Sequence, residues 1–88
     1  MYILNTQRTQ IVNTEFVERF CISEKPDAAL VVASYSTQIP PVTMGRYQNL
    51  EEAQGVLSDL LIALAGGQMC YYMPVSYTHL TLPTMAVV

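Results

Sequence analysis

Charged side chains are scarce in this sequence. Only 12% of the 88 residues are charged, against a hydrophobic fraction of 51%, and the net charge is -3. This balance excludes a solvated, disordered chain and is typical of a globular protein with a weakly repelled surface. The cations do not form the clustered basic surface that binding to nucleic-acid phosphates requires, because four scattered residues supply them: Arg8, Arg19, Lys25 and Arg46. A nucleic-acid-binding regulator therefore remains only an alternative.

Cysteine is also rare. The two cysteines, Cys21 and Cys70, are far apart in the sequence and lack the close pairing of a zinc site. Each lies in an apolar run typical of a strand, so we expect two buried thiols that pack as small hydrophobic side chains. A disulfide is one alternative, and a thiol-dependent redox or catalytic function of either residue is another. We expect no metal and no cofactor.

No segment has the length of a membrane span. The longest apolar run, residues 56–65, is interrupted by Ser58 and Asp59 and is shorter than the roughly 20 residues that a spanning helix needs. The N-terminus lacks the basic region and the apolar core of an export signal. We therefore expect a cytoplasmic protein without a membrane partner.

The apolar pattern changes from period two to helical spacing and back. Alternating residues between turn signals predict short strands, which lie at residues 2–4, 10–13, 16–24, 28–35, 42–47 and 68–73. The short polar side chains of residues 13–15 favour a local turn, and Gly45 favours a bulge in its strand. Five of these strands precede the helix and follow one another as a meander.

One helix is predicted between residues 50 and 65. Asn49 is a good N-cap, Glu52 completes a capping box, and Gly66-Gly67 ends the helix. Its apolar stripe is expected to comprise Leu50, Ala53, Leu57, Leu60, Leu61 and Leu64. The fold class is therefore α+β, an antiparallel β-meander of about five short strands packed by one amphipathic helix, with a final truncated strand.

The run Val75-Ser76-Tyr77-Thr78-His79-Leu80-Thr81-Leu82-Pro83-Thr84 resembles translated sequencing-adapter DNA. This resemblance implies that residues 1–74 form a single α+β domain, that residues 75–88 are a non-native tail, and that the native C-terminus is missing. His79 would then have no function. Since it is the single histidine, neither a Ser-His-Asp nor a Cys-His site could be built.

Residues 1–74 carry a second resemblance, in Tyr2-Ile3-Leu4-Asn5, in residues 11–20 and in residues 63–68. These segments resemble small uncharacterised proteins of bacterial mobile elements, of conjugative or prophage-like kind. The resemblance implies no activity, cofactor or catalytic residue.

The final strand is rich in tyrosine and methionine, which are enriched at protein-binding surfaces. We take Tyr71, Tyr72 and Met73 as candidate contact residues, together with Ile62, the large apolar side chain on the polar face of the helix. Core packing of the strand is the alternative. These features favour contact over chemistry. We expect a small intracellular, non-catalytic interaction or accessory module, not an enzyme, that binds a protein partner or a second copy of itself.

Overall fold

The structure, a computed structural model, describes residues 1–36 and 38–75. Its elements are β1 (Tyr2–Leu4), β2 (Ile11–Asn13), the 3-10 helix η1 (Thr14–Phe16), β3 (Val17–Lys25), β4 (Ala28–Tyr35), β5 (Val42–Tyr47), α1 (Leu50–Ala65) and β6 (Cys70–Tyr72). The α+β class, with one α-helix and short strands, is confirmed. His79 and most of the adapter-like segment lie outside the described residues.

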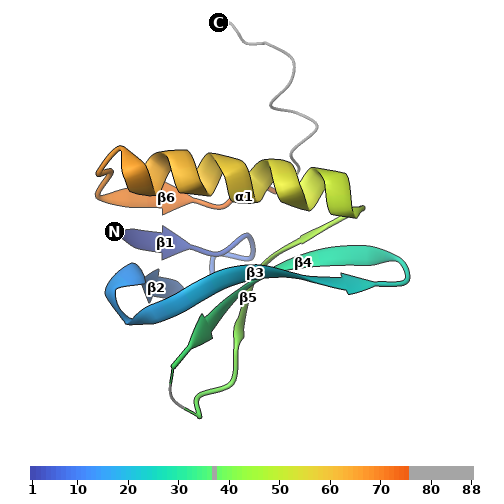
Figure 1. The fold of residues 1–88 in the computed structure, drawn as a ribbon, viewed down its shortest axis with the longest axis horizontal. Helices are drawn as coiled ribbons and strands as arrows, with labels where there is room; N and C mark the ends of the chain where they lie inside the picture. Colours follow the sequence, from blue (N-terminus) through green and yellow to red (C-terminus); the bar gives the residue numbers. More distant parts are fainter. Residues whose placement is uncertain (37, 76–88) are drawn as a thin grey trace, which may run out of the picture.

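The strands form two three-stranded sheets, sheet A in the order β2-β1-β6 and sheet B in the order β3-β4-β5. Sheet B is antiparallel throughout. In sheet A, β1 pairs antiparallel with β2 and parallel with β6. The five strands before α1 therefore do not run as one continuous meander, because β1 and β2 belong to sheet A and β3, β4 and β5 to sheet B. After α1 the chain returns beside its first strand (Figure 1). A parallel pair needs a long crossover, and the intervening sheet B and α1 supply it.

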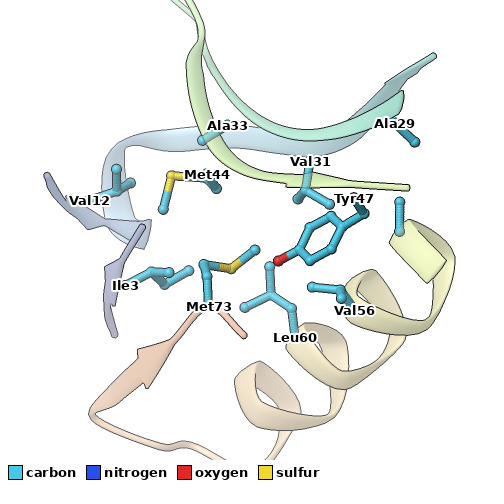
Figure 2. Packing of buried hydrophobic residues seen from close by; sticks show 11 residues of the cluster. Ile3, Val12, Ala29, Val31, Ala33, Met44, Tyr47, Val56, Leu60 and Met73 are labelled. Carbon is cyan, nitrogen blue, oxygen red and sulfur yellow. The ribbon is translucent and has the colours of Figure 1, made fainter. Parts of the chain in front are cut away.

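A single core joins both sheets to the helix. Sheet A contributes Ile3 and Val12, sheet B contributes Val31 and Met44, and α1 contributes Leu60, each with at most 2% of its surface exposed. Figure 2 shows these side chains directed toward one another between the two sheets and α1. A fully buried leucine contributes about 2 kcal/mol. Because both sheets contribute side chains to this one cluster, the stability of both depends on it.

The ends of α1 confirm the expected caps. The Asn49 side chain accepts a hydrogen bond from the Glu52 backbone amide at 2.8 Å, and the Glu52 carboxylate accepts one from the Gln48 amide at 3.0 Å. This reciprocal arrangement satisfies two amides that would otherwise lack helical partners. At the other end, Gly67 has a φ of 72°, the left-handed conformation that favours glycine after a helix.

The buried face of α1 is rotated from the predicted stripe. Ala53 and Leu60 are buried as expected, but Val56 and Ala63 occupy the other buried apolar positions. The small alanine side chains allow the helix to pack closely on sheet B. Larger members of the predicted stripe lie at the flank of this face or in solvent, namely Leu50, Leu57, Leu61 and Leu64.

Two irregularities in sheet B decide which side chains face the core. A register shift between Val17 and Arg19 interrupts the alternation of β3, so that Val17 and Phe20, which are three residues apart, both pack against the core. A second shift lies in the pairing of β4 with β5 beside Gly45, which confirms the predicted bulge. A Cβ atom on Gly45 would lie only 2.5 Å from the Tyr47 hydroxyl oxygen.

Two asparagine side chains hold the N-terminal hairpin and the turn that follows it. The buried Asn5 accepts hydrogen bonds through Oδ1 from the amides of Thr9, at 2.9 Å, and Gln10, at 3.1 Å. Asn13 Oδ1 accepts one from the Glu15 amide at 3.1 Å. The predicted local turn at residues 13–15 is therefore confirmed, as the start of η1.

Candidate interaction surface

The outward side of sheet A is an uncharged surface, which we call the neutral face. Since alternate strand residues point to opposite sides, the inward position of Ile3 leaves its neighbours pointing outward. Tyr2 is 54% exposed, Ile11 69% and Tyr72 66%. The register of the three strands places six outward residues together, namely Tyr2, Leu4, Ile11, Asn13, Cys70 and Tyr72.

A hollow adjoins the neutral face, between β6 and the C-terminal half of α1. It has a volume of about 390 Å3 and is lined by Asp59, Ile62, Ala63, Gln68, Tyr71, Tyr72 and Pro74. Ile62 is 69% exposed, and Tyr72 belongs to both the hollow and the neutral face. The structure thus brings together three of the four candidate contact residues, from a helix and a strand.

Met73, the fourth candidate contact residue, lies elsewhere. Its side chain is 5% exposed and belongs to the core cluster (Figure 2). The Met73 backbone amide donates a hydrogen bond to the Leu4 carbonyl at 3.0 Å, which draws this part of the chain toward β1. Met73 is therefore a core residue and is removed from the candidate surface.

Tyr47 positions the segment that follows β6, a role that the sequence did not reveal. Its hydroxyl donates a hydrogen bond to the Pro74 carbonyl at 2.7 Å. Burial raises the pKa of the Tyr47 hydroxyl well above its usual value, and Tyr71 and Glu52 add to the shift. Tyr47 therefore stays neutral and can donate. The alternating pattern of β5, with a bulge at Gly45, was the one sequence signal that could have placed this tyrosine inward.

The cysteines differ from the expectation of two buried thiols. Both are free; Cys21 is half-buried and Cys70 is exposed. Each occupies an outward position of its strand, Cys21 between the inward Phe20 and Ile22, and Cys70 opposite Tyr2. In residues 1–36 and 38–75, no three side chains of the types that bind metals lie together. The expectation of buried thiols was wrong because an apolar run does not specify which side of a strand is covered.

The cations are distributed over separate elements. Arg19 and Lys25 lie on β3 and Arg8 lies in the hairpin turn after β1, while Arg46 on β5 forms an exposed ion pair with Asp27 at 3.2 Å. An exposed pair of this kind contributes little to stability. The outward side of sheet B therefore carries cations on its two outer strands, around the half-buried Leu30 and Val32 of β4, unlike the neutral face.

None of the helices in the described part of the chain is long and apolar enough to cross a membrane. Comparisons of the chain with protein-family models, with curated proteins and with solved structures find no match. The function of the chain is therefore inferred from its own residues.

Proposed function

We propose that the chain is a small intracellular, non-catalytic interaction or accessory module whose contact surface is the neutral face together with the adjoining hollow. The observation that carries this proposal is the position of Tyr72, which is 66% exposed and shared by both parts of the surface. Ile62 extends the surface onto α1, and Tyr2 and Ile11 extend it across sheet A.

The chemistry of the surface favours a protein as its occupant. Burying apolar surface contributes about 25 cal/mol per Å2, and tyrosine side chains dominate many protein interfaces because they combine apolar area with a polar hydroxyl. The described outward residues of sheet A carry no charge to desolvate. The polar residues of the contact surface are Asn13 on the neutral face and Asp59 and Gln68 in the hollow. The occupant is a protein partner or a second copy of the chain.

The experiment compares exposed substitutions on and off this surface. Ile62→Asp and Tyr72→Asp place a charge on the proposed contact, while Phe16→Asp is the matched control, because Phe16 is 68% exposed on η1 and lines neither the hollow nor the neutral face. Sedimentation across a concentration series measures self-association, and chemical crosslinking in the cell identifies a protein partner. We expect either contact to be lost in the first two variants and kept in the control.

A monomer that forms no crosslinked complex would contradict the proposal. So would a complex that survives both substitutions on the surface, or one that is lost equally in the Phe16→Asp control. Circular dichroism of every variant shows that any loss is not caused by unfolding.

A further inference from the structure

A second apolar groove runs between β3 and the flank of α1. It has a volume of about 340 Å3, and the described residues that line it are uncharged. Leu57, Leu61 and Leu64 stand at helical spacing beside the buried face of α1, and Phe20 faces them from β3. Leu61 is 66% exposed. The groove is separate from the proposed contact surface, since it shares no lining residue with the hollow beside β6.

The groove lies beside a free strand edge. β3 is the outermost strand of sheet B, and within residues 1–36 and 38–75 no strand pairs with its other side. The strand is nine residues long. An outermost strand offers a row of backbone donors and acceptors to an incoming segment. An edge next to an apolar groove provides both backbone pairing and a place for side chains.

We propose that this groove binds an extended peptide segment of another protein, which adds to β3 as a further strand of sheet B. Every second side chain of an added strand points to the same side. One set would therefore lie between Phe20 and the leucines of α1, where the uncharged lining accepts apolar side chains. Backbone pairing supplies affinity in this mode, and the pockets supply specificity.

The outward side of β3 determines the charge of the segment. Arg19 and Lys25 are exposed there, and in the described part of the chain neither has a carboxylate partner. They are six residues apart, which corresponds to about 20 Å along a strand. A complementary segment has acidic residues opposite these two cations and apolar residues on its other side.

The charges on β3 disfavour a second copy of the chain as the occupant. In a two-fold antiparallel pairing of β3 with itself, opposite residues must point to the same side, so the possible registers differ by two residues. The register centred on Ile22 places Arg19 opposite Lys25. Like charges directly opposite one another are destabilising. No register of this kind places an acidic residue of β3 or its flanks opposite both Arg19 and Lys25, so we assign the acidic segment to a different protein.

A displayed library of random nine-residue peptides tests this inference with the full chain as the target. We expect the enriched peptides to alternate apolar and acidic residues and, when synthesised, to protect the β3 backbone amides from hydrogen exchange. Leu61→Asp should weaken their binding about tenfold. Ile62→Asp is the matched control, because Ile62 is the next residue of α1 and is 69% exposed but lines the other hollow. Arg19→Glu should weaken binding at low salt and have less effect at high salt.

Three results would overturn the inference. The library could yield no enriched peptide, the enriched peptides could bind the Leu61→Asp variant as tightly as the original chain, or amide protection could fall on β2 or β6 instead of β3. The last result would leave the contact surface of sheet A intact, so failure of this inference and failure of the proposed function are distinguishable.

Discussion

The two sheets share one core but present different outward sides. Sheet A is built from strands of three residues, and its outward side carries tyrosine, aliphatic and thiol groups without charge. Sheet B has strands of six to nine residues, and its outward side carries Arg19, Lys25 and Arg46 around the half-buried Leu30 and Val32. The core accounts for the inward sides of both. It does not account for the apolar outward side of sheet A, which is why we assign that side to contact.

The largest expected effect tests whether the two sheets fold together. Leu60→Asp places an unpaired charge in the core, where Leu60 is 1% exposed, and we expect a loss of about 4 kcal/mol or more, sufficient to unfold the domain. Leu61→Asp, at the neighbouring exposed position, should change stability by about 0.5 kcal/mol or less. Thermal unfolding followed by circular dichroism measures both. A folded Leu60→Asp variant would show that the two sheets do not share this core.

The second prediction concerns the hairpin of sheet A. Asn5→Ala removes the acceptor of the Thr9 and Gln10 amides, and leaving buried polar groups unpaired costs about 1 to 3 kcal/mol. Urea unfolding of the variant measures this loss. Asn13→Ala is the control, because its bond to Glu15 is exposed, and we expect a smaller loss. Equal losses would indicate that the burial of Asn5 is not what makes its hydrogen bonds important.

The third prediction concerns the hydrogen bond between Tyr47 of sheet B and Pro74, which follows β6. Tyr47→Phe removes the hydrogen bond to Pro74 and should reduce stability by about 1 kcal/mol at neutral pH. In the unfolded chain tyrosine ionises near pH 10, whereas burial keeps the folded group protonated to higher pH. The contribution of Tyr47 is therefore complete below about pH 10 and falls as the pH rises further. As the pH rises through this alkaline range, the Tyr47→Phe variant should lose less stability than the original chain. An identical dependence of stability on pH in the two proteins would contradict the role assigned to the Tyr47 hydroxyl.

The smallest expected effect on stability is on the proposed contact surface, the neutral face with the adjoining hollow. Tyr72→Asp and Ile62→Asp alter side chains that are largely exposed, so unfolding free energies should change by about 0.5 kcal/mol or less even where contact with a partner is lost. Denaturant unfolding measures these changes. A large loss in either variant would show that these residues stabilise the fold and are not reserved for contact.

Local signals in the sequence predicted much of the fold. Asn49, Glu52 and the glycine pair after residue 65 define the ends of α1 through bonds within a few residues, and these were correct. The pairing of β1 with β6 joins residues almost 70 positions apart in the chain, and no local pattern encodes it. That pairing also explains why Ile3 is buried beside Tyr71 in sheet A.

The candidate site was also predictable only in part, because residue types are visible in the sequence whereas burial depends on distant parts of the chain. Ile62 could be selected because a large apolar residue on the polar face of a helix is unusual, and Tyr72 because the final strand is rich in tyrosine and methionine. The structure places both at one hollow. The burial of Met73 depends on how the chain continues past β6 toward the core, which residue type does not reveal. The groove beside Leu61 was missed because its leucines were all assigned to the core stripe, whereas Val56 and Ala63 fill that space.

The two cysteines provide the most direct test, because Cys70 lies on the outward side of sheet A and Cys21 on the outward side of sheet B. Their alkylation rates are measured on the isolated monomer at low concentration and again in the associated state, with the partner or at high chain concentration. We expect association to slow the alkylation of Cys70 and to leave that of Cys21 unchanged. Slower alkylation of Cys21 with Cys70 unaffected would place the contact on the wrong sheet and contradict the proposed function.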